Sequence, residues 1–552
     1  MNPVSLETIE LLIPELLLAA TALGIFLGGA FLGPRALWSW IAQAGLLLAG
    51  GHILWHHILS ETPQHGVFGP VGSDGFSDVL RCAAVLVGLL FVCLAMRRGQ
   101  EGPSPEATGS MLLVIAGLMI VSCAEELVML FLGLELISIP TYLLLFLGRN
   151  EAEGGQPDTG LRDVGTYEAS SKYFFLSVLS SAILLYGFSF LYGLTGELRL
   201  DGIAEGLATN EVGGPLPVLA LLLVMAGLGF KIAAVPFHFY APDVYQGTTN
   251  LNAGLLSVIP KIAGVVVLIR LVAAVLPPDM AQFGWQLVLV LSVLTMTLGN
   301  VAALWQNNIR RMLAYSSIAH AGYMLIGLCA FLAARSSQAG GSEIVSVVGL
   351  PSLLLYLAVY VAASLGTFAA IIHLGQREQP IDRIEQLAGL GRSRPLIGLA
   401  LAVFMFSLAG IPPLAGFWGK LGLFYAALQI EATTDLTIAG VPMRVAMIAL
   451  AAIGAMNAAI AAAYYLRVVS TIYFRPSADS SHGLASVSLR RTPGAAFVMG
   501  ACMLIVIALG CQPGWLVHLS RTTATAAIKG SSAVSTPDVS QQAQLTHDSA
   551  DR

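Results

Sequence analysis

The chain has 552 residues, of which 56% are hydrophobic and only 11% are charged, and its mean hydropathy is +0.79. A soluble domain carries roughly 25% charged residues, so this composition excludes a soluble protein and predicts an all-α polytopic membrane protein. The net charge of −5 is spread over short loops. No basic patch with interleaved aromatic residues occurs, which excludes a typical nucleic-acid-binding protein.

The six cysteines lie in or beside apolar segments and form no CxxC motif. We expect them to be small core residues rather than metal ligands or disulfide partners. The sequence also shows no haem or iron–sulfur motif, so we expect no cofactor and no metal site in this chain. The N-terminal stretch lacks a basic region and a cleavage site, and we expect the first apolar run to be retained as a helix.

Apolar runs of about 20 residues, the length that spans a bilayer, occur along the whole chain. We expect fourteen transmembrane helices, at residues 9–32, 36–58, 77–96, 111–123, 127–147, 171–193, 216–239, 252–276, 285–305, 316–334, 350–374, 396–428, 443–473 and 495–517. The seventh and twelfth contain internal breakers, which predicts broken helices there. Residues 518–552 are rich in Ser, Thr and Gln, and we expect a disordered polar tail.

The spans group into two blocks of five helices, spans 4–8 and spans 9–13. The expected organisation is a single transmembrane domain at 1–517, divided into N-terminal helices (1–110), a first repeat (111–276), a second repeat (285–473) and a last helix (495–517). Because five is odd, the second block enters the membrane from the opposite side. In the fourth helix of each block a lysine lies near a proline, since Lys231 precedes Pro236 and Lys420 follows Pro412. This pattern predicts two inverted repeats.

The distribution of arginine predicts the orientation of the helices. Loops after odd-numbered spans hold fourteen arginines, whereas loops after even-numbered spans hold essentially only Arg199 and Arg335. Because short basic loops stay on the cytoplasmic side, we expect both termini on the outer side. In a bacterium this is the periplasmic side of the inner (plasma) membrane.

Only five of the basic side chains are lysines, and four of these lie in or at the edge of apolar segments: Lys172, Lys231, Lys261 and Lys420. A charged lysine at the centre of a bilayer costs about 2.5–3.5 kcal/mol on insertion scales. Unlike arginine, a desolvated lysine can release its proton. Four such residues in one chain therefore predict a path for protons.

Glu135 lies about two turns into the fifth span, where a carboxylate needs a cation or a proton. We interpret it as a proton-coupled partner of Lys231, because a carboxylate that approaches or leaves would load or unload that lysine. The alternative is a static ion pair that fixes the packing of the helices. Lys172 begins the sixth span and could tune this pair, or it could extend to the membrane interface instead.

Two histidines complete the predicted relay. We expect His238 to shuttle protons between Lys231 and Lys261, and His320 to continue the path towards Lys420, which lies beside Trp418. Alternatively, both are structural histidines with satisfied hydrogen bonds.

Other polar residues near these spans have weaker assignments. Tyr315, Ser316 and Ser317 offer hydroxyls for a hydrated chain near His320. Asp243 and Tyr245 are expected in a short polar loop that admits or seals cytoplasmic water, or that is a simple turn. Arg270 and His373 are expected at helix ends or in loops, without a functional role.

Five sequence runs together resemble the antiporter-like membrane subunits of respiratory complex I. They are LGLELISIPTYLLL, ASSKYFFLSVLSSAILLYG, GFKIAAVPFHFYAPDVYQG, NIRRMLAYSSIAHAGYMLIG and SLAGIPPLAGFWGK. Among these paralogues, the PDVYQG run, the lysine in the twelfth span and the absence of a long C-terminal lateral helix are most similar to the subunit N family of NADH–quinone oxidoreductase. The resemblance implies fourteen helices with two inverted five-helix repeats, and a relay that matches Glu135, Lys172, Lys231, His238, Lys261 and Lys420.

One departure from the family pattern follows the PDVYQG run. Such subunits usually continue with Ala-Pro-Thr-Pro, whereas this chain has Thr248-Thr249-Asn250-Leu251. The loss of the prolines affects the expected shape of the connection between spans 7 and 8.

The resemblance also implies a function. The chain would be a proton-translocating subunit of an NADH–quinone oxidoreductase (a translocase), driven by redox chemistry in partner subunits that hold FMN and iron–sulfur clusters. Its partners would be the lipid bilayer and neighbouring antiporter-like and small membrane subunits of complex I. One alternative is a cation/proton antiporter subunit of a multi-subunit sodium–proton assembly. Another is a structural spacer whose polar line is a relic.

Overall fold

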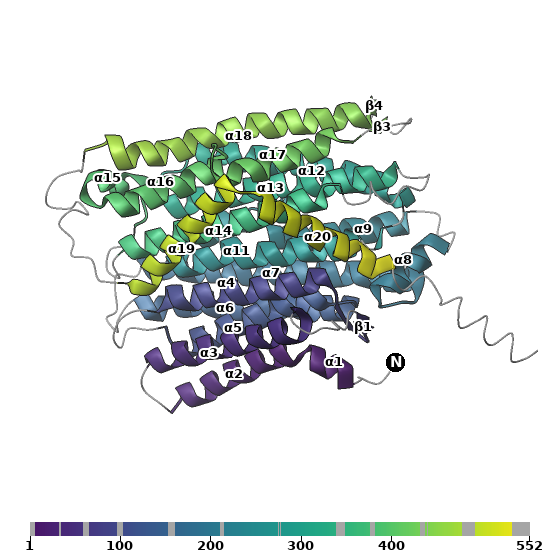
Figure 1. The fold of residues 1–552 in the computed structure, drawn as a ribbon, viewed down its shortest axis with the longest axis horizontal. Coiled ribbons are helices and arrows are strands. Elements are labelled where there is room, and N and C mark those ends of the chain that lie inside the picture. Colours follow the sequence, from purple (N-terminus) through teal and green to yellow (C-terminus); the bar gives the residue numbers. More distant parts are fainter. Residues whose placement is uncertain are drawn as a thin grey trace, which may run out of the picture.

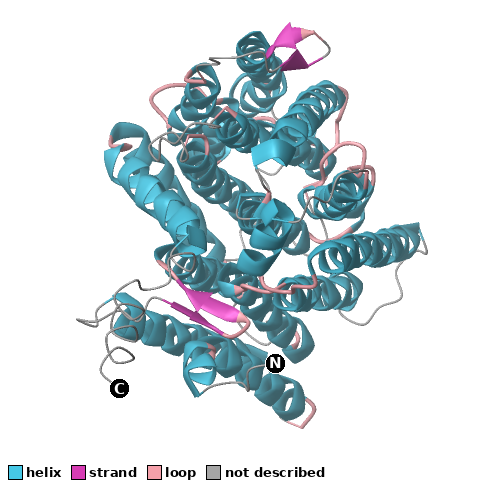
Figure 2. Ribbon diagram, turned by 90° about the vertical axis from the view of Figure 1, so that its right-hand side faces the viewer, coloured by secondary structure: helices cyan, strands magenta, loops and turns pink. Residues whose placement is uncertain are grey.

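A computed structural model gives the fold, and its elements are drawn in Figure 1. The residues that the structure describes are 6–31, 35–58, 66–96, 103–152, 161–209, 215–273, 275–276, 278–337, 348–375, 381–430, 437–438, 440–476 and 492–532. The end-on view of Figure 2 shows long helices that pack side by side in a bundle.

The N-terminal part contains three long helices and a hairpin. Its elements are α1 (Leu6–Leu11), α2 (Ile13–Gly29), α3 (Arg35–Ile53), the π-helical turn η1 (Leu54–Ile58), β1 (Gly66–Phe68), β2 (Val71–Ser73) and α4 (Gly75–Ala95). The two strands pair antiparallel. Asp74 begins α4 with a capping box, in which its carboxylate accepts from the Ser77 N–H.

The two blocks of helices follow. The first consists of α5 (Pro105–Cys123), α6 (Leu127–Ala152), α7 (Leu161–Thr195), α8 (Leu200–Thr209), α9 (Leu216–Ile232), α10 (Tyr240–Gly247), α11 (Asn250–Leu268) and the π-helical turn η2 (Ile269–Ala273). The second consists of α12 (Pro278–Leu304), α13 (Ile309–Ser336), α14 (Leu350–Leu374), the 3-10 turn η4 (Ile384–Leu387), α15 (Leu390–Ser393), α16 (Pro395–Ala409), α17 (Ala415–Leu428), the short hairpin β3 (Thr437–Ile438) and β4 (Val441–Pro442), and α18 (Met443–Phe474). The described chain ends with α19 (Pro493–Cys511) and α20 (Gly514–Ser532).

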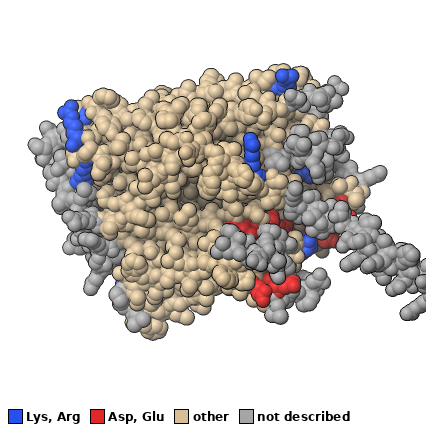
Figure 3. Space-filling view, viewed as in Figure 1, with Lys and Arg blue, Asp and Glu red and all other residues tan. Residues whose placement is uncertain are grey.

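Among the described residues, 11 helices are long and apolar enough to cross a membrane. Three shorter apolar helices, α2, α9 and α16, lie in the predicted first, seventh and twelfth spans. On the face shown in Figure 3, the visible acidic side chains lie towards one end of the bundle and most of the surface between the ends is uncharged. The chain is therefore an all-α polytopic membrane protein, which confirms the predicted fold class.

Among the described helices that were not predicted, α20 and α8 are the longest. Residues 518–532 belong to α20, so the prediction of a disordered tail is wrong for them, and residues 533–552 lie outside the described part. α20 begins directly after Pro513, which separates it from α19, and it packs against α4 and α14. The other helix is α8, which lies at one end of the bundle (Figure 1) and buries Leu200 and Ile203.

The same backbone contact occurs once in each block. Glu126, just before α6, forms an isolated β-bridge with Arg199, and Asn308, just before α13, forms one with Arg383. Both bridges join the start of the second helix of a block to the segment that leads to its broken helix. Arg199 of the first bridge directly precedes α8. Arg383 of the second bridge directly precedes η4, which is followed by α15. Figure 1 shows α8 and α15 at opposite ends of the bundle. This recurrence is what two inverted repeats predict.

The seventh and twelfth predicted spans are both interrupted. Ala233, with φ 59°, ends α9, and Gly410, with φ 88°, ends α16, both in the left-handed conformation. The connections to α10 and α17 contain cis peptide bonds at Val235–Pro236 and Pro412–Pro413. The last carbonyls of α9 and α16 therefore have no following helical turn to bind them, and they are available to side chains.

Helices α12 and α13 are in backbone contact. A Cβ atom on Gly299 would overlap the backbone nitrogen of Ala319, and one on Gly322 would overlap that of Met296. The Ser292 hydroxyl donates to the Gly322 carbonyl at 2.7 Å. Glycines are therefore needed on both helices for this approach.

A charged cluster ties α4, α5 and η2 together near one end of the bundle. Arg270 donates to the Ser122 carbonyl at 2.6 Å and to the Glu125 carboxylate at 2.5 Å, and it lies 3.3 Å from Asp74. Burial raises the pKa of the Glu125 carboxyl, and the Arg270 guanidinium opposes this effect. Arg270 lies at the end of a helix, in the turn that continues α11, which is one of the two expected places, and its guanidinium is buried among these partners.

A second buried ion pair joins α2 to α4. Arg81 donates to both carboxylate oxygens of Glu15, at 2.8 and 2.7 Å, and to the Leu11 carbonyl at 2.6 Å. The exposed fractions of the two side chains are 0% and 3%. Such a bidentate pair fixes both the distance and the orientation of two helices.

Candidate functional site: a line of buried lysines

Lys231 lies in the last turn of α9 and is almost completely buried. Its Nζ donates to the hydroxyls of Ser138, Ser177 and Ser181, at 2.7, 3.3 and 3.4 Å. The nearest Glu135 oxygen is 4.0 Å from Nζ, and the Ser181 hydroxyl donates to that same oxygen. Glu135 and Lys231 therefore lie together as predicted, and the Ser181 hydroxyl contacts both the carboxylate and the amine.

The serines around Lys231 were not among the predicted site residues. They come from α6 and α7, and their spacing supplies the signal that could have identified them. Ser177 and Ser181 are four residues apart, so they lie on one face of α7, and Ser138 lies three residues after Glu135 on α6. Hydroxyls both donate and accept hydrogen bonds, so this set can hold the amine in either protonation state.

His238 does not share a helical face with Lys231, because α9 ends at Ile232. It lies in the turn that connects α9 to α10, between the exposed residues Pro236 and Phe239. Among the described residues, no hydrogen bond or ion pair joins it to Lys231 or Lys261. The continuous helical face that would join His238 to Lys231 is therefore absent, and the shuttle role of His238 stays a prediction.

Lys261 follows Pro260 inside α11, a helix of which every residue from Asn252 to Leu268 is buried. The adjacent turn of α11 touches Lys231, since a Cβ on Gly264 would lie 3.6 Å from the Lys231 Cβ. Within the described part of the chain, no hydrogen bond to the Lys261 amine is present. The two lysines thus lie on neighbouring helices, one hydrogen-bonded and one not.

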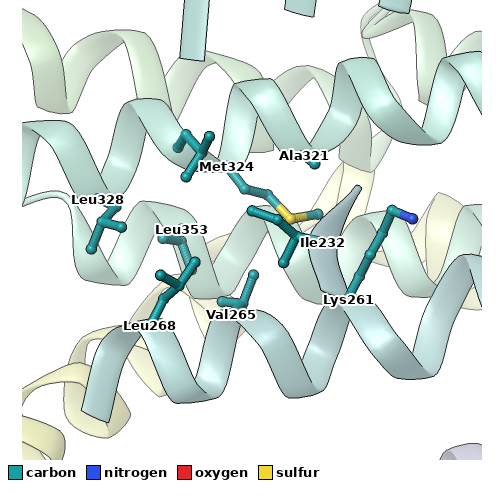
Figure 4. A pocket seen from close by; sticks show the side chains of 9 residues that line it. Ile232, Lys261, Val265, Leu268, Ala321, Met324, Leu328 and Leu353 are labelled. Atoms are coloured by element: carbon teal, nitrogen blue, oxygen red, sulfur yellow. The ribbon is translucent and has the colours of Figure 1, made fainter. Parts of the chain in front are cut away.

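A small cavity lies beside the Lys261 side chain. It has a volume of about 10 Å³, the least that holds one water molecule. Its walls are otherwise apolar, formed by Ile232, Val265, Leu268, Ala321, Met324, Leu325, Leu328 and Leu353. Figure 4 shows the amine directed away from the end of the cavity lined by Leu328 and Leu268.

His320 is buried on α13, and both of its ring nitrogens face tyrosine hydroxyls. Nδ1 lies 2.6 Å from the hydroxyl of Tyr356 on α14, and Nε2 lies 3.0 Å from that of Tyr465 on α18. The ring is close enough to Lys261 and Lys420 to interact electrostatically with both. His320 therefore lies near both lysines, and its role in carrying protons from one to the other stays a prediction.

A second set of hydroxyls leads from α10 towards His320. Tyr245 lies 3.5 Å from the Ser317 hydroxyl, which lies 2.9 Å from that of Tyr360. Tyr360 donates to the Ser257 carbonyl of α11, and its ring centroid is 5.0 Å from that of His320. Of the hydroxyls predicted near His320, Ser316 bonds to Tyr465.

Lys420 lies on α17 and binds the end of α16. Its Nζ donates to the carbonyls of Leu408 and Ala409, at 3.0 and 2.8 Å. These carbonyls belong to the last turn of α16, where the helix dipole favours a positive charge. The indole N–H of Trp418, two residues before Lys420 in the chain, donates to the Gly510 carbonyl of α19 at 2.8 Å.

Lys172 lies outside this line. Its side chain is 38% exposed, and its amine is 2.5 Å from Glu168 and 2.7 Å from Asp243. Asp243 also binds Arg311 of α13 at 2.8 Å. Among the described contacts, none joins Lys172 to the Glu135–Lys231 pair that it could tune, and Asp243 lies in the helix α10 rather than in the expected loop.

At Thr248–Leu251, where the sequence differs from the family pattern, α11 begins with an ordinary N-terminal cap. The Thr249 hydroxyl accepts from the Asn252 N–H at 3.3 Å and caps α11. The connection from α10 to α11 is therefore short without the family's prolines.

Comparisons with known proteins identify the family of the chain. Residues 124–445 match the family described as NADH:quinone oxidoreductase/Mrp antiporter, TM. NADH-quinone oxidoreductase subunit N of Rhodospirillum rubrum is 35% identical over 87% of this chain and 90% of the relative. The protein of the same name from Trichlorobacter lovleyi is 35% identical over 86% of this chain and 89% of its own.

Solved structures give the same grouping. A chain of respiratory complex I from Thermus thermophilus with bound aureothin has a TM-score of 0.70 and 31% identity, and the match covers 92% of this chain and 100% of that one. A chain of the Mrp complex from Dietzia sp. has a TM-score of 0.73 but 23% identity, over 95% of this chain and 99% of that one, and shows a common fold. This chain therefore belongs to the NADH:quinone oxidoreductase/Mrp antiporter membrane family and, within it, to the group named NADH-quinone oxidoreductase subunit N.

Proposed function

We propose that this chain is a proton-translocating membrane-arm subunit of an NADH–quinone oxidoreductase, with a relay formed by Glu135, Lys231, Lys261, His320 and Lys420. The observation that carries the proposal is the burial of three lysines along one line. The exposed fractions of Lys231, Lys261 and Lys420 are 5%, 3% and 4%. Intramembrane ionisable residues are rare and mark proton or ion pathways.

The proposed order of transfer runs from one helix to a neighbouring helix. A proton taken up near Asp243 reaches the serine cluster around Lys231, passes to Lys261 on the adjacent helix, and continues to His320. Tyrosine hydroxyls surround His320 and lead the proton or its charge towards Lys420. The proposed order leaves out two predicted members, His238, which lies in the turn after α9, and Lys172, which pairs with Glu168 and Asp243.

The energy required to move one proton against the membrane potential is similar to the energy of breaking one buried ion pair. Moving one charge against 100 mV costs about 2.3 kcal/mol. Removing one partner of a buried ion pair costs about 3–5 kcal/mol. A movement that separates Glu135 from the Lys231 cluster, driven from a neighbouring subunit, is therefore sufficient to discharge the lysine.

The proposal places the redox chemistry in other subunits. Among the described residues, no group of three or more His, Cys, Asp and Glu side chains gathers as a metal site would require. FMN and iron–sulfur clusters would reside in partner subunits, and the membrane partners would be the neighbouring antiporter-like and small subunits. The location would be the bacterial inner membrane, with both termini on the periplasmic side.

Substitution of Lys231 in the assembled, membrane-bound complex tests the relay. Lys231→Ala should abolish proton pumping and much of the NADH–quinone turnover. Lys231→Arg should also stop pumping, because arginine keeps its proton. Lys529→Ala, at a lysine outside the proposed relay, is the matched control. Normal turnover and normal pumping in Lys231→Ala would remove this lysine from the relay.

The shared fold with the Mrp complex favours one alternative, a cation/proton antiporter subunit without a redox link. The complex should be purified through a tag on this chain, and its flavin, iron–sulfur and NADH-driven pumping should be measured. NADH-driven pumping by a flavin-containing assembly supports the proposal. A flavin-free assembly that exchanges sodium for protons would establish the alternative.

A further inference from the structure

The groups that stabilise a positive charge on the Lys420 amine differ from those around the Lys231 amine. Within the described residues, no carboxylate lies within 4 Å of it. Its partners are the two α16 carbonyls and, on the other side, the face of the Tyr323 ring, whose centroid is 4.9 Å from Nζ. The side chain of Tyr323 comes from α13, one turn after His320.

The Tyr323 ring is held in place by a buried amide. Asn300 Nδ2 donates to the Tyr323 hydroxyl at 3.1 Å and to Asn457 Oδ1 at 3.3 Å. Asn300 Oδ1 accepts from the Tyr464 hydroxyl at 3.1 Å. Both N–H groups and the carbonyl of Asn300 are therefore used, and its amide has one orientation.

The second asparagine anchors the first to α18. Asn457 Nδ2 donates to the Thr297 hydroxyl at 3.1 Å and to the Ile453 carbonyl at 3.0 Å. The exposed fractions of Asn300 and Asn457 are 0% and 1%. A buried polar network whose groups are satisfied in this way is rigid.

The glycine contact between α12 and α13 places this network at the Tyr323 hydroxyl. Gly299 precedes Asn300, and Gly322 precedes Tyr323, and these two glycines allow the helix backbones to touch. A wider separation would remove the hydrogen bond between the two side chains. The position of Tyr323 is thus determined by its neighbour Gly322 on α13 and by Gly299 and Asn300 on α12.

We propose that Tyr323 is a cation–π partner that stabilises the protonated form of Lys420, and that Asn300 and Asn457 are positioning residues that hold its ring. A desolvated ammonium over an aromatic face gains more than an exposed one. An amide neither gains nor loses a proton at neutral pH, so it orients the ring without adding a charge that competes with Lys420. The inference rests on the proposed relay and assigns the group that stabilises its last lysine.

Stepwise fluorination of the ring tests the cation–π contact. Phenylalanine and its mono-, di- and trifluorinated analogues are inserted at position 323 of the full-length chain, and NADH-driven pumping is measured in assembled complex. Each fluorine withdraws charge from the ring face while the side chain keeps nearly the same size. We expect pumping to fall progressively, by roughly tenfold over the series. Equal pumping by all four side chains would overturn the proposal.

Three substitutions separate ring chemistry from packing. Tyr323→Phe keeps the ring and should retain pumping within about twofold, whereas Tyr323→Leu should lose it by roughly tenfold. Asn300→Leu in the tyrosine protein should reduce pumping by about as much as Tyr323→Phe does, because both changes remove the same hydrogen bond, and Asn300→Leu in Tyr323→Phe should add little. Full additivity of the two changes would contradict the positioning role.

Lys420→Ala distinguishes this inference from the proposed function. If Lys420→Ala abolishes pumping while the fluorinated series is flat, the relay stands and the cation–π contact does not. If Lys420→Ala pumps normally, the role of Lys420 in the relay fails, and the inference fails with it.

Discussion

Lys231, Lys261 and Lys420 are all buried, yet the groups around their amines differ. Lys231 has three hydroxyls and a carboxylate, and Lys420 has two carbonyls and an aromatic face. Lys261 has apolar walls and a cavity at the lower limit for one water. A standing charge is therefore most costly on Lys261, and in the proposed relay this lysine would carry a proton only transiently.

This difference predicts that Lys261→Met abolishes proton pumping without lowering the stability of the protein. Replacing a buried ionisable group by an apolar one of similar size is often neutral or stabilising. We expect the variant complex to assemble and to unfold thermally at or above the wild-type temperature, while NADH-driven pumping is lost. A clear fall in thermal stability would show that the Lys261 amine contributes to the fold.

For the Arg81–Glu15 pair, we expect that removing one charged group lowers the stability of the protein. Glu15→Gln leaves the buried guanidinium of Arg81 without its counter-ion, which should cost about 3–5 kcal/mol. Thermal unfolding of the detergent-solubilised protein measures this loss. The double change Glu15→Leu with Arg81→Met removes both charges and should recover much of the stability, and a double variant as unstable as Glu15→Gln would contradict this account.

At the scale of elements, the breaks in α9–α10 and α16–α17 position the lysines. A Cβ on Gly410 would lie 2.9 Å from the Lys420 Cδ, and its φ of 88° disfavours a side chain. Gly410→Ala should therefore cost about 1–2 kcal/mol in backbone strain and displace the lysine from the α16 carbonyls.

We expect Gly410→Ala to reduce pumping severalfold in assembled complex. Gly500→Ala in α19 is the matched control, because a Cβ there has nothing within 4 Å. Equal pumping by the two variants would show that the lysine tolerates the displacement.

The elements were predictable from sequence where hydrophobicity alone decides them. The apolar runs predicted the helices, and Pro236 and Pro412 predicted the two breaks. α20 was not predicted, because its stability comes from contacts with α4 and α14 rather than from its own composition. The place of His238 was also not predictable, since it depends on the left-handed residue Ala233 and not on helical spacing.

The site was predictable to a similar degree. Lysines in apolar spans are rare enough to be recognised individually, and Glu135 and His320 followed from the same argument. Tyr356, Tyr360 and Tyr465 were not recognised, because buried tyrosines are common and their hydroxyls become meaningful only when three helices bring them around His320. The residues that carry charge were thus identifiable, and the neutral groups that connect them were not.

For the whole molecule, α20 closes the bundle by packing against α4 from the N-terminal part and α14 from the second block. A chain that ends after Cys511 should expose apolar surface on both helices. We expect assembly into the complex, assayed by native gel electrophoresis, to fall severalfold. A chain that ends after Ser532 keeps α20 and should assemble normally, and equal assembly of both would show that α20 is dispensable.

The complete burial of α11 has a consequence for biogenesis. This helix belongs to the first block, but part of its surface is covered by α13 and α14, which are synthesised later. Until the ribosome has delivered them, the flank of α11 must face lipid or an insertion factor. We expect a nascent chain arrested before α13 to remain crosslinkable to the insertion machinery, and to be released only when the second half arrives.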